Sequence, residues 1–185
     1  MTFERGTTFI EILFVTALIA VLAGMAVPQA LTAIDRSRGW AAARYLAGKM
    51  AVARSQAVMR SANVALRFDV NGSDYAFRMY VDGNRNGVRS ADIASGLDRP
   101  IDTKVRLSDL FPGVAVAATP DIASSPVKLG STNLLSFTPL GTSTSGSIYV
   151  RSRDGLQLAI RVLGATGRTR VLRYVPLTGQ WVDSF

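Results

Sequence analysis

The chain has 185 residues, a length that suits one compact domain with an appendage, and it carries a formal net charge of +8. It contains neither cysteine nor histidine, which excludes disulfides, thiol nucleophiles, His-based catalytic triads and ordinary zinc sites. The 13 acidic residues form no paired cluster for carboxylate catalysis, so the sequence predicts no enzyme, no cofactor and no metal site, and its charge favours acidic surfaces or polyanions as partners.

The N-terminal segment begins with a polar leader, Met1 to Gly6, and continues into an apolar run from Phe9 to Val27. At 1.5 Å per residue, these roughly 19 positions form a helix of about 28 Å, close to the ~30 Å hydrocarbon core of a bilayer. We therefore expect residues 7–28 to cross a membrane once. Arg5 favours a cytoplasmic N-terminus and an exported C-terminal domain, although Glu4 weakens this preference.

Glu11 interrupts the apolar run, and a carboxylate inside lipid costs on the order of a few kcal/mol unless it is neutralised or paired. No basic side chain lies within one helical turn of it. If the leader were removed after Gly6, the new amine of Thr7 would lie one turn away, in this chain or in a neighbouring one. The alternatives are an ordinary secretory signal cut near 24–26, a plain membrane anchor and a buried soluble helix. Secretory signals seldom contain a carboxylate in their apolar core, a plain anchor leaves Glu11 unexplained, and a buried helix needs a partner for Glu11 from elsewhere in the fold.

The run from Gly6 to Leu13 resembles the class III signal of type IV pilins and pseudopilins. The resemblance implies that a membrane aspartyl peptidase, the prepilin peptidase, cleaves after Gly6 and N-methylates Thr7, although the family usually has phenylalanine at the position of Thr7. It also implies that Glu11 acts in filament assembly and that Pro28 falls where the family bends its first helix.

After Pro28 the chain lacks proline as far as Ser61, and Leu46, Met50, Ala53 and Ala57 form a stripe at helical spacing. We expect an amphipathic helix over 29–61 that lies on a sheet. Gly39 and Gly48 weaken this helix by roughly 1 kcal/mol each, unless another backbone packs closely against them.

From Val64 onward apolar residues recur at every second position, which predicts β-strands. Asn71-Gly72 marks a turn between the first two strands. The expected strands lie at 64–68, 75–81, 105–107, 114–116, 134–138, 147–151, 156–163 and 171–175, with loops at 119–126 and 141–146. The predicted fold class is α+β, a long N-terminal helix packed on an antiparallel β-sheet domain. The expected segments are a leader (1–6), a transmembrane helix (7–28), an amphipathic helix (29–61) and a β domain (62–185).

The helix motif from Ala53 to Arg60 before the first strand, and Gly167-Arg168-Thr169-Arg170 before the strand at Val171, resemble the GspH/FimT family of minor pilins. The resemblance implies a pilin-like fold and a minor pseudopilin or pilin subunit of a type II secretion system or type IV pilus, incorporated into a filament or its tip. The implied partners are other pilin subunits through the N-terminal helix, the prepilin peptidase and the inner-membrane assembly platform. The implied location is the bacterial inner membrane, with a single span and the C-terminal domain in the periplasm.

The Gly167 to Arg170 segment is a candidate DNA-binding site. Alternate residues of an extended strand point the same way, so Arg168 and Arg170 would face one phosphate backbone, with Arg161 and Arg173 extending the patch. In FimT-like pilins a Gly-Arg-x-Arg motif is linked to DNA uptake in natural transformation, which gives the alternative function. The same turn is common in GspH-like secretion pseudopilins, and two solvated arginines on a hairpin remain the simpler interpretation.

The segment from Asp82 to Gly87 resembles the front of a calcium-binding loop, with alternating oxygen ligands and a glycine. Ile93 stands where such a loop needs a bidentate glutamate, and Arg85 and Arg89 would repel a divalent cation. We therefore expect a turn stabilised by its own Asp and Asn side chains.

Overall fold

The computed structural model describes residues 8–72, 74–130 and 132–183. The chain divides into two compact units, which meet at the bond between Ile34 and Asp35. Helix α1 (Phe9–Arg60) begins in the first unit and ends in the second, and antiparallel strands follow it. The expected α+β, pilin-like class is therefore confirmed.

The described part of the first unit consists of the N-terminal half of α1, whose large apolar side chains are exposed. Within the described chain, α1 is the helix that is long and apolar enough to cross a membrane. Its hydroxyls bond to its own backbone: Thr16 Oγ1 donates to the carbonyl of Leu13 at 2.9 Å, and Thr32 Oγ1 to that of Pro28 at 3.0 Å. Such internal hydrogen bonds let polar side chains sit in a segment that water does not reach. The helix continues through Pro28.

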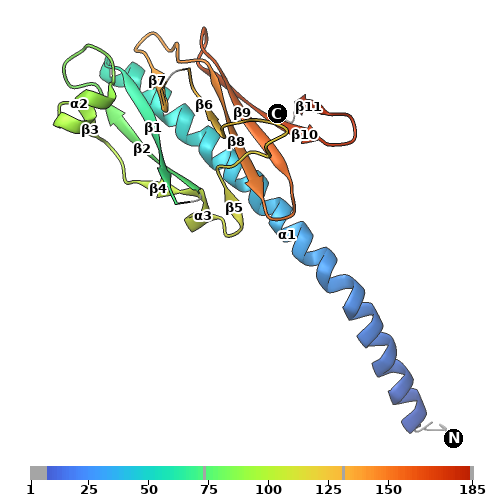
Figure 1. The fold of residues 1–185 in the computed structure, drawn as a ribbon. Helices are drawn as coiled ribbons and strands as arrows, with labels where there is room; N and C mark the ends of the chain where they lie inside the picture. Colours follow the sequence, from blue (N-terminus) through green and yellow to red (C-terminus); the bar gives the residue numbers. More distant parts are fainter. Residues whose placement is uncertain (1–7, 73, 131, 184–185) are drawn as a thin grey trace, which may run out of the picture. The chain divides into compact units, whose positions relative to one another are not determined.

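The second unit contains two antiparallel sheets, shown in Figure 1. Helix α2 (Ser90–Ser95) lies between two strands of the first sheet, and helix α3 (Leu107–Leu110) lies where the chain passes from the first sheet to the second. The first sheet has the order β3 (Arg99–Pro100), β2 (Asp74–Val81), β1 (Val64–Asn71), β7 (Leu134–Phe137), with β4 (Val105–Arg106) also paired to β2. The second has the order β11 (Gln180–Asp183), β10 (Arg168–Val175), β9 (Gln157–Leu163), β8 (Gly146–Ser152), β5 (Val114–Ala115), with β6 (Val127–Lys128) also paired to β8.

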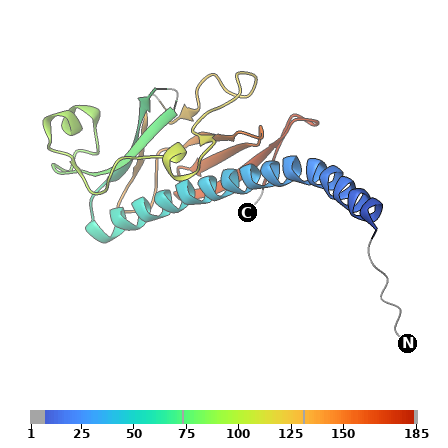
Figure 2. The ribbon, with the colours of Figure 1, turned by 90° about the horizontal axis from the view of Figure 1, so that it is seen from below.

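The half of α1 that belongs to the second unit packs along both sheets (Figure 2). The expected stripe is confirmed, because Leu46, Met50, Ala53 and Ala57 are fully buried. One core cluster joins this stripe to Phe68 and other inward-facing residues of both sheets. The inward-facing side chains of β1 and β2 and the buried stripe of α1 therefore form a single core, as the sequence predicts.

Gly39 and Gly48, the glycines of α1 after Pro28, differ in their surroundings. A Cβ atom on Gly39 would lie 3.1 Å from Cβ of Ser152 and 3.2 Å from Cδ2 of Leu156, so the backbone of α1 approaches the β8–β9 hairpin closely there. Gly48 lies on the solvent side of the helix, with open space where its Cβ would be. Only Gly39 is required by packing.

Candidate assembly and anion-binding sites

Glu11 lies in the first turn of α1, among exposed apolar side chains that include Phe9, Ile10 and Ile12. The turn closes when the backbone N–H of Glu11 donates to the carbonyl of Thr8 at 3.0 Å. Among the residues that the structure describes, Glu11 has no ion-pair partner. Its position near a helix N-terminus is electrostatically favourable for a carboxylate but does not replace a counter-ion in lipid.

The residues predicted for leader cleavage and methylation, Gly6 and Thr7, lie outside the described residues. Pro28 lies inside α1, and its ring removes the N–H that would bond to the carbonyl of Gly24. The structure thus places Glu11 and Pro28 on one continuous helix.

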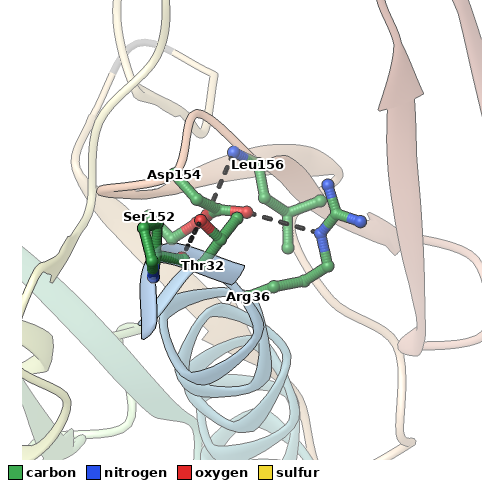
Figure 3. Close-up of polar contacts among 6 residues, drawn as sticks. Thr32, Arg36, Ser152, Asp154 and Leu156 are labelled. Carbon is green, nitrogen blue, oxygen red and sulfur yellow. Dashed lines mark hydrogen bonds and ion pairs between the residues drawn. The ribbon is translucent and has the colours of Figure 1, made fainter. Parts of the chain in front are cut away.

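An ion pair ties α1 to the β8–β9 hairpin near the start of the second unit (Figure 3). The carboxylate of Asp154, only 2% exposed, accepts from Arg36 Nε at 3.4 Å and from the backbone N–H of Leu156 at 3.4 Å. Ser152 Oγ donates to Oδ1, the same oxygen that accepts from Leu156, whereas Arg36 donates to Oδ2. Together with the close approach at Gly39, these contacts hold the helix against the hairpin. The sequence pattern did not single out Asp154, because an Asp before Gly155 predicts only a turn.

The β9–β10 hairpin forms as expected, and Gly167 is the residue that permits its close packing. The N–H groups of Thr166 and Gly167 both donate to the carbonyl of Leu163, at 3.2 and 2.8 Å, and close the turn. Gly167 has a φ of +59°, and a Cβ atom there would lie 2.4 Å from the carbonyl oxygen of Gly141. A larger residue would therefore be strained in its backbone and would collide with the neighbouring loop.

Arg168 and Arg170 lie on the sheet face that is turned away from α1. Their cross-strand neighbours show this, because Arg170 is opposite Arg161, whereas Thr169 between them is opposite Val162, which belongs to the core shared with α1. Arg161 therefore shares the face of Arg168 and Arg170. Two like charges directly opposite each other on adjacent strands destabilise the pair, so this arrangement concentrates positive charge at some cost.

The expectation that Arg173 extends this patch is wrong. Arg173 is opposite Leu158, which faces the core shared with α1, so it lies on the other face of the sheet. The period of two explains the error, since Arg173 is an odd number of residues from Arg168 and Arg170. It lines a separate cavity of about 300 Å³, together with Arg36, Trp40 and Tyr174.

A larger groove, about 610 Å³ in volume, separates β10 from the last turns of α1. One wall is the segment from Gly167 to Arg170, and the other is formed by α1. The α1 wall consists of Ala51, Arg54, Ser55, Val58 and Met59. These α1 residues were missed from the sequence, because they lie outside the buried stripe and nothing in their spacing marks them as neighbours of residues more than a hundred positions away.

The turn expected at 82–87 is organised around Asp82, which is buried. One carboxylate oxygen accepts from the backbone N–H groups of Asn84 and Arg85, and the other from Gly87 N and Asn63 Nδ2. Burial raises the pKa of Asp82, but these four hydrogen bonds, of which that from Asn63 lowers the pKa most, outweigh it and hold the pKa below its ordinary value. The oxygens of Asp82 thus face backbone donors.

A long apolar helix that leads into an antiparallel domain, with a lone carboxylate in its first turn, defines a pilin-like protein. The family profile described as "Type II transport protein GspH" matches residues 42–167, which is more than half of the chain. The chain therefore belongs to the GspH family, a structural and non-enzymatic family of membrane-anchored pseudopilins that associate with one another in type II secretion. No curated protein and no solved structure matches the chain. The matched range ends at Gly167, so it leaves out the apolar helix and both arginines of the hairpin motif.

Proposed function

We propose that this chain is a minor pseudopilin or minor pilin subunit, which the prepilin peptidase trims after Gly6 and which enters a filament or its tip through α1. The observation that carries this proposal is the single carboxylate of Glu11 in an exposed apolar helix. An unpaired charge there is costly in lipid, whereas the core of a filament brings other subunits' N-termini close to it.

In this proposal the apolar half of α1 stores the subunit in the inner membrane, with the second unit in the periplasm, until the assembly platform extracts it. Packing against neighbouring helices then replaces lipid contacts. Glu11 pairs with the amine of residue 7, freed by cleavage, on its own or a neighbouring chain. The ion pair between Arg36 and Asp154 and the close packing at Gly39 would transmit the movement of the helix to the domain.

The first prediction concerns Glu11→Ala. Removing one member of a low-dielectric ion pair costs about 3–5 kcal/mol, so the variant should insert in the membrane normally but fail to enter filaments. Sheared filament fractions and membrane fractions, compared by immunoblot in cells that make the whole assembly system, measure the two steps.

Thr16→Ala is the matched control, because Thr16 lies on the same helix and bonds only to its own backbone. Mass spectrometry of both variants should give a chain that starts at Thr7, which separates failed assembly from failed processing. Normal incorporation of Glu11→Ala would rule out the ion pair, and a native chain that starts at Met1 would rule out the maturation step.

A second candidate function, DNA binding as in FimT-like pilins, is favoured by three arginines on one face, Arg161, Arg168 and Arg170. Each phosphate contact steepens the log–log salt dependence of affinity by about 0.9, so Arg168→Ala with Arg170→Ala should flatten it by about 1.8 on any duplex sequence. Gel shifts of the full chain in detergent at several salt concentrations measure this slope. Arg99→Ala, an exposed arginine of the other sheet, is the control. Unchanged affinity of the double variant at low salt would eliminate this function.

A further inference from the structure

In the part of the chain that the structure describes, strand β10 has a free edge along its first half. Strand β9 pairs with Arg168–Arg173 on one side, but on the other side β11 pairs only with Leu172–Val175. Within the described chain, no strand lies along that second side of residues 168–171. Backbone N–H and C=O groups that point outward from such an edge are ready to pair with another strand.

The groove of about 610 Å³ lies beside this free edge. On its α1 wall the apolar side chains of Val58 and Met59 are 51% and 76% exposed. This volume lies in the range of clefts that bind ligands. Arg54 stiffens the groove, because its Nε donates to the carbonyl of Gly141 at 3.1 Å, next to Gly167.

Strand β11 shows which side chains suit a strand that pairs with this edge of β10. Its residues Trp181 and Asp183 alternate onto the face of Arg168 and Arg170, with Trp181 against Tyr174 (5.2 Å between ring centres) and Asp183 against Arg170 (3.4 Å). Arg168, two residues further along the same face, has no ion pair within the described residues. A strand that continues along the edge would thus meet an unneutralised arginine on one face and Val58 and Met59 on the other.

We propose that the free edge at Arg168–Val171 binds an extended segment of a partner protein, which adds a strand to the second sheet. Its alternate side chains are carboxylates that face Arg168 and Arg170, and those between them are apolar and enter the groove toward Val58 and Met59. Main-chain hydrogen bonds supply affinity in this mode of recognition, and the alternating side chains supply specificity. The surface is separate from the N-terminal helix, so the proposal goes beyond filament entry through α1.

A labelled synthetic peptide that alternates Glu and Val, titrated into the full chain in detergent and followed by fluorescence anisotropy, tests the proposal. Binding should be saturable, and hydrogen exchange should slow at the backbone amides of residues 168–171. Val58→Asp should weaken binding about tenfold, because it places a carboxylate against the valine side chains of the peptide in the groove. Val52→Asp is the matched control, since Val52 is equally exposed (50%) on the same helix but does not line the groove.

Two further probes separate the contribution of Arg168 from that of backbone pairing. Arg168→Ala should weaken the peptide about tenfold, whereas Arg99→Ala should not change its affinity. A peptide N-methylated at alternate amides keeps its charges but cannot pair as a strand, so it should not bind. Equal binding of the N-methylated peptide would overturn the strand addition. Failure of the unmodified peptide to bind, while duplex DNA of similar charge binds and loses affinity in Arg168→Ala, would overturn a protein partner in favour of a nucleic acid.

Discussion

At the scale of single residues, Asp82 determines the conformation of the loop that follows β2. Its two oxygens accept four hydrogen bonds, three of them from backbone N–H groups between Asn84 and Gly87. Asp98 plays a similar part at the other end of the loop, because it is buried and accepts from the backbone N–H groups of Gly83 and Arg89. The loop is thus held by carboxylates that bond to main chain, and its segment of alternating Asp and Asn residues is explained without a ligand.

The stability of the fold should depend on pH through the ionisation of Asp82. Because the folded-state pKa of Asp82 is lowered, its ionised form stabilises the fold above the unfolded pKa of about 3.9, and this contribution is lost as the pH falls through the folded pKa. Asp82→Asn should therefore cost about 1–3 kcal/mol at neutral pH, and the difference from the wild type should shrink below about pH 4. Urea unfolding of the full chain in detergent at both pH values measures the difference.

The control for this prediction is Asp92→Asn in the neighbouring helix α2, whose carboxylate accepts a 3.4 Å contact from Asn84. It should change stability little at either pH. If Asp82→Asn lowers the free energy of unfolding by the same amount at neutral and at acidic pH, the loop requires the shape of the Asp82 side chain and not its ionised form.

At the scale of elements, long periodic segments were predictable and short ones only in part. The stripe from Leu46 to Ala57 and the alternation in β1 and β2 each repeat several times, so a local pattern was enough to define them. Of the two-residue strands, β3 and β6 were missed, whereas β4 and β5 fall within the expected ranges 105–107 and 114–116. Residue Leu107, expected in a strand, begins the short helix α3, and its burial alone does not distinguish the two.

The candidate sites divide in the same way. The shared face of Arg168 and Arg170 follows from the period of a strand, which the sequence reveals. The groove beside them does not, because it depends on the packing of α1 against β10, and Val58 and Met59 belong to the face of the helix that its core stripe leaves exposed. The division of the strands between two sheets is likewise set by pairing between distant segments, such as β1 with β7. Such contacts are tertiary and leave no local pattern.

At the scale of the whole molecule, the chain divides into an apolar segment and a domain with its own core. Every residue of the main core cluster lies after Ile34, and the ion pair of Arg36 with Asp154 also falls within the second unit. The described residues of the first unit contribute no buried side chain. The free energy of folding of the domain should therefore come from residues 35–185 alone.

The final prediction is that a fragment of residues 35–185 folds without detergent and unfolds cooperatively, because it keeps the buried stripe of α1 and both sheets. Circular dichroism and tryptophan fluorescence during urea unfolding should give coincident transitions. Leu46→Ala should destabilise the fragment by about 2–5 kcal/mol, since Leu46 is fully buried where α1 meets the sheets. Val52→Ala, at a half-exposed position on the same helix, should change stability little. A fragment that stays unfolded or gives no cooperative transition would mean that the apolar segment contributes to the domain's core.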